Sequence, residues 1–265
     1  MPEPALRAVD LSRAFGSVRA VDGVSFVLPK GGSLGIVGES GSGKTTTARI
    51  VVGLDRADTG EVIVGGRSRP ARVRGRARRL ARAREVQMVF QDPCLSLDPR
   101  TSVESVLRET LRLHFPDRDH TLRVRELLDQ VGLSTRAVEA RPGQLSGGQR
   151  QRVAIARALA VEPAVLVLDE AVAALDVSVQ AQILNLLADI REETAIGYLF
   201  ITHDLGVVRC VTDDVIVMRH GRVVESGATA DVLSGPRHPY TRLLMGSVPR
   251  PGWDPERIAA ARRAL

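Results

Sequence analysis

Hydrophobic and polar positions alternate with two different periods along the chain, and the changes of period divide it into short elements. Strands are predicted where apolar and β-branched residues gather between turns, at 6–11, 21–28, 60–65, 86–90, 198–202 and 215–218. A fully apolar run at 164–168 is typical of a strand buried on both faces of a parallel sheet. Another apolar run, 33–37, opens into a glycine-rich stretch and then continues in helix-forming residues to Leu54. This order predicts a strand, a glycine loop and a helix.

Apolar residues three or four positions apart predict helices at 102–113, 122–131, 148–159 and 179–190. Gly132 and Pro163 follow two of these segments as stop signals. The stretch 93–144 is helical in character, which makes it the best candidate for an inserted helical subdomain. Strands that alternate with helices indicate an α/β fold with a largely parallel sheet.

Composition places the chain among ordinary folded proteins. It has 265 residues, of which 44% are hydrophobic and 26% charged, which excludes a disordered tail or a disulfide-stapled miniprotein. A helix that crosses a bilayer needs about 18–20 consecutive apolar residues, and no stretch of this sequence comes near that length. The start of the chain has no signal-peptide pattern. Cys94 and Cys210 stand apart, without the spacing of a zinc site or a disulfide framework. We therefore expect a soluble intracellular chain whose membrane role, if it has one, comes through a partner.

Positive charge is concentrated in one segment. The chain carries 37 basic and 31 acidic residues, and nine arginines without any acid lie in 67–84, which leaves 28 basic residues elsewhere. A basic run can mark a nucleic-acid contact, but this one contains no aromatic residue for base stacking. We expect a solvated, partly helical surface segment, and contact with anionic lipid headgroups stays open as an alternative.

The glycine loop matches the phosphate-binding pattern G-x-x-x-x-G-K-[ST] in residues Gly38, Glu39, Ser40, Gly41, Ser42, Gly43, Lys44 and Thr45. Glycines allow successive backbone N–H groups to surround phosphate oxygens, and the helix that follows adds its positive end. Lys44 would contact the β and γ phosphates, and the Thr45 hydroxyl would ligate Mg²⁺. Thr46 lies next in the same helix start and is a further candidate for nucleotide binding.

Two carboxylates end the apolar run 164–168. Asp169 would hold the Mg²⁺ shell, and Glu170 would orient and polarise the attacking water. Alone, such a pair is usually just the start of a loop. Combined with the phosphate-binding loop, it favours nucleotide hydrolysis.

Residues 145–152 read LSGGQRQR, which resembles the signature motif of ATP-binding cassette (ABC) ATPases. The resemblance implies a second anion site, formed by Ser146, Gly147, Gly148 and Gln149, that serves the ATP of a partner subunit.

The other motifs of this family follow in order from about residue 5 to residue 250. Gln91 resembles the Q-loop glutamine that reaches the metal, Asp176 ends a sequence that resembles the D-loop, and His203 resembles the switch histidine that contacts the γ-phosphate. Phe15 stands where the family usually places a Tyr that stacks on adenine. Three of these residues also have a plainer alternative: a turn for Gln91, a surface or capping role for His203 and an ordinary strand position for Phe15. Ala173 departs from the family, which commonly has Ser there.

The resemblance implies a P-loop NTPase core with a mostly parallel sheet, an antiparallel β subdomain and an inserted helical subdomain. We expect an ABC ATPase domain over 5–250, with the insertion at about 93–144, and a C-terminal tail over 251–265.

Three stretches, 87–103, 175–187 and 236–244, are similar to the oligopeptide, dipeptide and nickel importer subfamily. The resemblance implies an ATP-hydrolysing importer subunit that uses ATP and Mg²⁺ at the cytoplasmic face of the membrane. Its expected partners are a second ABC ATPase subunit, identical or paralogous, two integral membrane permease subunits and, indirectly, a solute-binding protein. For the segment 236–244, the plainer alternative is a helix that only docks the C-terminus. Two other functions stay open, namely a soluble ABC ATPase that acts on nucleic acid through 67–84 and a regulatory cassette without transport, although we do not expect nucleic acid as a partner.

Overall fold

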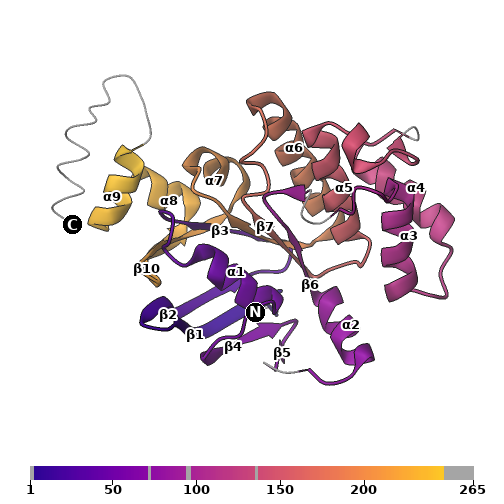
Figure 1. The fold of residues 1–265 in the computed structure, drawn as a ribbon. Coiled ribbons are helices and arrows are strands. Elements are labelled where there is room, and N and C mark those ends of the chain that lie inside the picture. Colours follow the sequence, from indigo (N-terminus) through magenta and orange to yellow (C-terminus); the bar gives the residue numbers. More distant parts are fainter. Residues whose placement is uncertain (1–2, 71–72, 94–96, 135–136, 248–265) are drawn as a thin grey trace.

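The computed structural model describes residues 3–70, 73–93, 97–134 and 137–247, and Figure 1 shows its fold. Its strands form a six-stranded sheet and a four-stranded sheet. The larger sheet has the order β10-β9-β3-β8-β7-β6, and its neighbours are parallel except for the β9–β10 hairpin. Its strands are β3 (Ser33–Val37), β6 (Val86–Val89), β7 (Val165–Asp169), β8 (Gly197–Ile201), β9 (Asp214–Arg219) and β10 (Arg222–Ala228).

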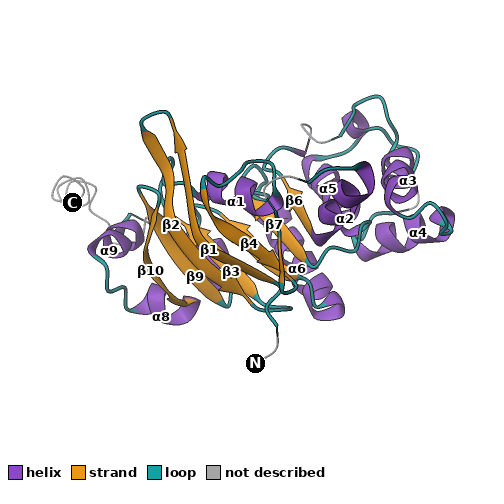
Figure 2. Cartoon of the chain, turned by 90° about the horizontal axis from the view of Figure 1, so that it is seen from below, coloured by secondary structure: helices purple, strands orange, loops and turns teal. Residues whose placement is uncertain are grey.

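The smaller sheet is antiparallel and has the order β2-β1-β4-β5. Its strands are β1 (Leu6–Phe15), β2 (Val18–Leu28), β4 (Thr59–Val64) and β5 (Arg67–Ser68). Figure 2 shows the strands gathered on one side of the molecule and most of the helices on the other. The mostly parallel sheet and the separate antiparallel sheet confirm the predicted fold class.

The helices are α1 (Lys44–Val52), α2 (Arg76–Glu85), α3 (Val103–His114), α4 (His120–Gln130), α5 (Gly147–Leu159), α6 (Val177–Thr194), α7 (Leu205–Val211), α8 (Thr229–Ser234) and α9 (Pro239–Gly246), with a 3₁₀ turn at Pro142–Gln144. The sequence pattern anticipated the longer ones but neither α7 and α8 nor strand β10. These elements are too short or too exposed to show a clear hydrophobic period.

Strand β7 lies between two clusters of the hydrophobic core. Leu166 and Leu168 belong to the cluster that contains the helical residues of α3–α6, whereas Val165 and Val167 belong to the cluster formed with the antiparallel sheet and α1. Successive side chains of a strand point to opposite faces, so a strand buried on both faces must be apolar at every position. The continuous apolar run at 164–168 is explained by this position.

The predicted insertion, 93–144, contains α3 and α4, and residues 94–96 and 135–136 lie outside the described part. Leu107 of α3 and Leu127 of α4 are fully buried in the same cluster as Ile155 of α5. Because α5 also packs on the core of the sheet, the helical region is attached through a shared hydrophobic core. Its independence as a subdomain, like the predicted boundaries 5–250 and the tail 251–265, stays a prediction, and that tail lies outside the described residues.

The arginine-rich segment is partly solvated, as predicted, with one exception. Helix α2 has no buried residue, but Arg69 is only 7% exposed. The Nε of Arg69 lies 3.0 Å from Glu85 Oε2, and its Nη2 donates to the backbone oxygen of Arg82 at 3.0 Å. Burial lowers the pKa of Arg69 to about 10. Arg69 therefore departs from the predicted solvated character of this segment, because it follows β5 directly and holds it to α2 instead of facing solvent.

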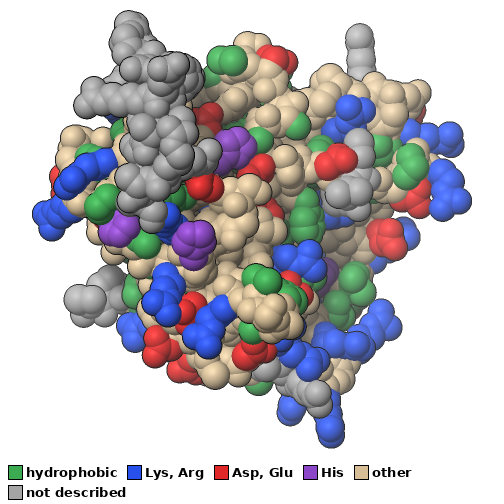
Figure 3. Space-filling model, turned by 60° about the vertical axis from the view of Figure 1, so that its left-hand side comes forward, with side chains coloured by type: hydrophobic (Ala, Val, Ile, Leu, Met, Phe, Trp, Pro, Cys, Tyr) green, Lys and Arg blue, Asp and Glu red, His purple; other side chains and the backbone are tan. Residues whose placement is uncertain are grey.

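Surface charge is otherwise mixed. On the face in Figure 3, basic side chains lie interspersed with acidic ones and gather most closely at the lower edge. Across the described ranges, no helix combines the length and apolar character needed to cross a bilayer. Cys210 is an exposed free thiol, and Cys94 lies outside the described residues.

The helical cluster yields a stability prediction. Leu107→Ala should lower the free energy of unfolding by about 2–5 kcal/mol, because it opens a cavity beneath α3. Leu113→Ala, on the same helix but 42% exposed, should change it by no more than about 0.5 kcal/mol. Urea unfolding followed by circular dichroism measures both, and equal losses in the two variants would contradict this packing.

Candidate active site

Several of the predicted site residues lie at one edge of the larger sheet, at the ends of four neighbouring parallel strands. The glycine loop follows β3, His203 follows β8, Asp169 ends β7, and Gln91 follows β6. In open α/β sheets, ligands bind outside the carboxyl ends of the strands, because chain ends and loops gather there. The order β3-β8-β7-β6 therefore lines up the loop, the histidine, the carboxylates and the glutamine along one edge.

The backbone of the glycine loop packs closely against two other backbone segments. At Gly38 a Cβ atom would clash with the carbonyl oxygen of Met218 in β9, and at Gly43 with that of Ala20 in β2. Gly43 also has a φ of 103°, in the left-handed region that favours glycine. Both positions therefore need glycine for space.

Helix α1 begins directly after this loop without a side-chain cap. Its cap residue is Gly43, and no side chain bonds the first N–H groups of the helix. These donors and the positive end of the helix dipole are the features that bind phosphate. Ser42 supports this, since its Oγ is buried without a hydrogen-bond partner among the described residues. The loop is thus suited to an anionic group.

Lys44 lies inside the loop with its ammonium group bonded to loop carbonyls. The residue is 6% exposed, and Nζ donates to Gly38 O at 2.7 Å and to Glu39 O at 2.9 Å. Burial lowers the pKa of Lys44, and the nearby charges of Glu170, Asp169 and Glu39 partly oppose this shift. The amine is therefore held close to the carboxylates that end β7.

Thr45 and Asp169 form an oxygen-rich pair beside Lys44. The Thr45 hydroxyl donates to Asp169 Oδ1 at 3.4 Å, and Asp169 is 9% exposed. Burial and the charge of Glu170 raise the pKa of Asp169, against the effects of Thr45, Lys44 and Arg49. A hydroxyl and a carboxylate are ligands that suit Mg²⁺, which usually takes few protein ligands beside phosphate oxygens. Gln91 lies exposed beyond the end of β6, and Thr46 is half-buried in the first turn of α1.

Glu170 and His203 form a second pair at the same edge, with His203 Nδ1 3.1 Å from Glu170 Oε1. The backbone N–H of Glu170 donates to Ile201 O at 2.8 Å, which continues the pairing of β7 with β8 beyond the strand end. Glu170 has a φ of 48°, an uncommon value for a residue with a side chain, and such strain often accompanies functional sites. The geometry suits a carboxylate that an imidazole orients.

The signature residues lie elsewhere, at the start of α5. Ser146 Oγ accepts from Gln149 N at 3.2 Å, and Ser146 N donates to Gln149 Oε1 at 2.9 Å, which closes a capping box. A Cβ at Gly148 would meet Val179 Cγ1 at 2.5 Å, so the neighbouring helix α6 requires glycine there, while Gly147 is half-buried. Within the described part of the chain, the hydrogen bonds of these side chains stay inside the helix start.

Two further predicted residues take local structural positions. Asp176 caps α6 by accepting from Val179 N at 3.0 Å. Phe15 is the last residue of β1, is 47% exposed, and lies 4.7 Å from the Arg13 guanidinium, measured to the ring centroid. The dimer-interface role of Asp176 and the adenine-stacking role of Phe15 stay predictions.

One contact of the glycine loop was not anticipated. The hydroxyl of Tyr240, at the start of α9, accepts from Glu39 N at 2.9 Å across 201 positions of sequence. The sequence suggested only that the segment 236–244 marks kinship or docks a helix. The available signal was the tyrosine itself, because a buried Tyr usually finds a partner for its hydroxyl.

The seating of the loop yields a stability prediction. Gly41→Ala should lower the free energy of unfolding by about 1–2 kcal/mol, because Gly41 has a φ of 79°. No further loss is expected there, since nothing lies within 4 Å of an added Cβ. Gly43→Ala should lower the free energy of unfolding by about 1–3 kcal/mol more than Gly41→Ala does, because its added Cβ clashes with the backbone carbonyl of Ala20. Thermal unfolding of both variants checks the difference, and equal costs would show that the loop is not seated on Ala20.

Comparison with known proteins agrees with this geometry. The profile of the ABC transporter family matches residues 21–173, and that of the oligopeptide/dipeptide transporter C-terminal region matches residues 224–264. The oligopeptide transport ATP-binding protein OppF of Bacillus subtilis is 44% identical over 91% of this chain and 80% of its own length. OppD of Mycobacterium tuberculosis is 48% identical over 95% of this chain, which spans 40% of the length of that relative.

Solved structures give the same result. The structure of cbiO1 from Clostridium perfringens, described as part of the ABC transporter complex cbiONQ, superimposes with a TM-score of 0.80 and 28% identity, covering 88% of this chain and 92% of that one. The ATP-binding cassette MJ0796, solved as a dimer in a post-hydrolysis state bound to ADP and Pi, gives a TM-score of 0.73 and 28% identity over 84% and 98% of the two chains. These matches confirm the resemblance found in the sequence, and the chain belongs to the ABC transporter family of ATP-binding cassettes.

Proposed function

We propose that this chain is the ATP-hydrolysing subunit of an ABC importer for peptides or related small solutes. The observation that carries the proposal is the meeting of the glycine loop, the Thr45–Asp169 pair and the Glu170–His203 pair at one edge of the sheet. Its relatives support the direction of transport, because one of them is named as a glutathione import ATP-binding protein, GsiA of Shigella flexneri, at 46% identity.

Phosphate binding is assigned to the loop and to Lys44. The uncapped N–H groups of α1 would surround the β and γ phosphates of ATP, and the Lys44 ammonium, now on two carbonyls, would turn to their oxygens. Thr45 and Asp169 would hold Mg²⁺, with Gln91 as a further ligand from the end of β6. The metal would neutralise charge on the phosphate oxygens during hydrolysis. Phe15 would stack on the adenine.

Water activation is assigned to Glu170. Its carboxylate would accept a hydrogen bond from the attacking water and draw away its proton, and the His203 ring would hold that carboxylate and contact the γ-phosphate. In this assignment the 3.1 Å contact is a positioning interaction. Asp169 is only 9% exposed, whereas the Glu170 side chain is 23% exposed, so Glu170 is the more accessible of these two acids.

Partners follow from the residues that this chain leaves outside its own site. Ser146 and Gln149 are exposed at the start of α5, which suits contact with ATP bound to a second cassette, identical or paralogous, and Asp176 would lie in that interface. The helical region 93–144 would contact two integral membrane permease subunits, which receive cargo from a solute-binding protein. The chain would then work at the cytoplasmic face of the membrane. The nucleic-acid alternative gains no support, since the relatives are named as transport proteins.

Replacement of the proposed base tests the ATPase assignment. Glu170→Gln should lower the turnover of ATP by about 10²–10⁴, because the amide cannot take the proton of the water. Binding of ATP, measured by isothermal titration calorimetry, should remain within about twofold because no phosphate contact is lost.

The matched control is Glu192→Gln, a charge change of the same kind on the exposed end of α6. It should leave both quantities unchanged. Unaltered turnover in Glu170→Gln would remove the assignment of Glu170.

Loss of the chain in its host tests the cargo class. Deletion should abolish the uptake of labelled tripeptides, and the wild-type chain but not Glu170→Gln should restore it, because transport requires hydrolysis. Uptake of free amino acids serves as the control and should be unaffected. Normal tripeptide uptake in the deletion strain would exclude peptides as the cargo.

A further inference from the structure

We propose that Tyr240 is a positioning residue for ATP binding, which sets the glycine loop and with it the ammonium group of Lys44. The inference rests on the proposed function, since it concerns the ATP site of that function. It assigns to the C-terminal segment a role in the nucleotide site of its own chain.

The contact acts on a single peptide group. The N–H of Glu39 donates to the Tyr240 hydroxyl at 2.9 Å, and the C=O of the same peptide, that of Gly38, accepts from Lys44 Nζ at 2.7 Å. A peptide group is planar, so fixing its N–H fixes the direction of its C=O. Hydrogen bonds in a chain also polarise one another, so the bond to Tyr240 strengthens the carbonyl as an acceptor. Tyr240 therefore acts on Lys44 through one rigid unit.

Glu39 also bonds to two other residues of the loop. Its own carbonyl accepts from Lys44 Nζ at 2.9 Å and from Ser42 N at 3.2 Å. The side of the loop that faces β9 is held at a second point, where Gly221 N donates to Ser42 O at 3.0 Å. The loop is thus fixed from two directions, once from the β9–β10 turn and once from α9.

The ring of Tyr240 is itself held firmly. Tyr240 is 1% exposed and belongs to a cluster with Val37, which is the last residue of β3 before the loop. The Arg219 guanidinium lies 5.0 Å from the centroid of its ring. A ring buried in the same cluster as the end of β3 leaves its hydroxyl little freedom of position.

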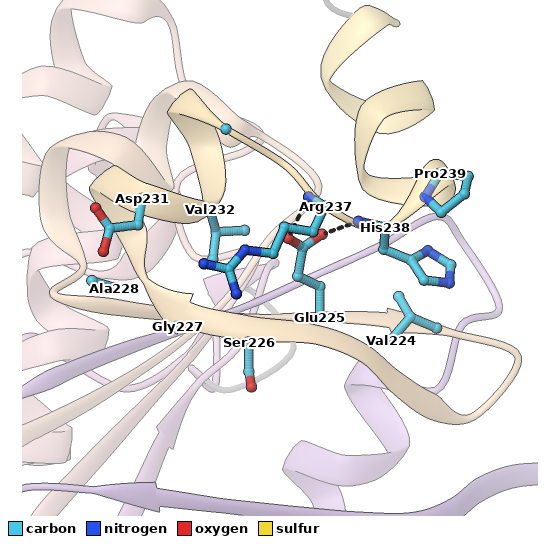
Figure 4. Close-up of a pocket in the computed structure, with 11 residues that line it drawn as sticks. Val224, Glu225, Ser226, Gly227, Ala228, Asp231, Val232, Arg237, His238 and Pro239 are labelled. Carbon is cyan, nitrogen blue, oxygen red and sulfur yellow. Dashed lines mark hydrogen bonds between the residues drawn. The ribbon is translucent and has the colours of Figure 1, made fainter.

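Strand β10 fixes the segment that carries Tyr240. The Glu225 carboxylate accepts from Arg237 N at 2.8 Å and from His238 N at 3.1 Å, as the dashed lines in Figure 4 show. His238 Nδ1 then accepts from Tyr240 N at 3.1 Å and caps α9, which begins at Pro239. These bonds lie at the wall of a hollow of about 590 Å³ that is lined by β10, α8 and the segment leading into α9. Each link between β10 and the loop is therefore a specific polar contact.

Removal of one hydroxyl tests the inference. Tyr240→Phe keeps the buried ring and deletes the bond from Glu39 N to the hydroxyl. We expect its Kd for ATP, measured by titration calorimetry on the full chain, to rise about 3- to 10-fold, the effect of one neutral hydrogen bond. The kcat at saturating ATP should stay within about twofold, because Tyr240 touches no reacting atom. A purely structural tyrosine would change the melting temperature without this split between affinity and turnover.

The control is Tyr198→Phe. Tyr198 is equally buried, at 1% exposed, and its hydroxyl has no hydrogen-bond partner among the described residues. Its Kd for ATP should equal that of the wild-type chain. Hydrogen–deuterium exchange gives a direct readout, since the amide of Glu39 should exchange faster in Tyr240→Phe and at the wild-type rate in Tyr198→Phe.

Unchanged ATP affinity or unchanged Glu39 exchange in Tyr240→Phe would overturn the inference, and so would an equal rise of Kd in both tyrosine variants. If Tyr240→Phe does not fold, Glu225→Ala tests the same link from its other end and should raise the Kd in the same direction. Lys44→Ala should lose ATP binding altogether. If the wild-type chain itself binds no ATP, the proposed function fails, and the exchange measurement then decides whether Tyr240 holds the loop.

Discussion

Parallel backbone pairing of β8 between β3 and β7 is the constraint on which the rest of the site depends. β8 pairs with β3 from Ser33 to Ile36 and with β7 from Val165 to Asp169, so the three strands end at the same edge. This register sets His203 between the glycine loop and the carboxylates. It also fixes Glu170, whose N–H continues the ladder to Ile201. The hydrogen bonds of a parallel ladder fix the stagger of neighbouring strands, so they also fix the relative positions of the side chains that follow the strand ends.

Close backbone approach and buried charge then shape the glycine loop. Gly38 and Gly43 let the loop rest on β9 and β2, and the Lys44 amine fits between two loop carbonyls. A compact ammonium on a flexible stem can occupy this place and still turn to phosphate, whereas the planar fork of arginine matches it poorly. In a chain with 37 basic residues and only two lysines, Lys30 and Lys44, the presence of lysine here has a physical reason.

Several residues serve the fold and the site together. Ser146 closes a capping box on α5, and Asp176 caps α6, yet both belong to motifs that we assign to the interface with a second cassette. A cap of this kind also fixes the orientation of a helix start. The β9–β10 hairpin has a comparable double role, because it supports the loop through Gly221 and holds the Tyr240 segment through Glu225. Elements that look peripheral in the sequence therefore contact the glycine loop or the segment that holds it.

The sequence by itself determined the class of fold, the position of the glycine loop, the carboxylates after the apolar run and the family, because these depend on local patterns such as glycine spacing and continuous apolar strands. It could not give the strand order, the burial of Arg69 against Glu85, or the bond from Tyr240 to Glu39 across 201 positions. Such contacts join residues whose separation in sequence carries no periodic signal. Only the tertiary structure decided them, because packing two sheets and a C-terminal helix around one loop selects which distant groups meet.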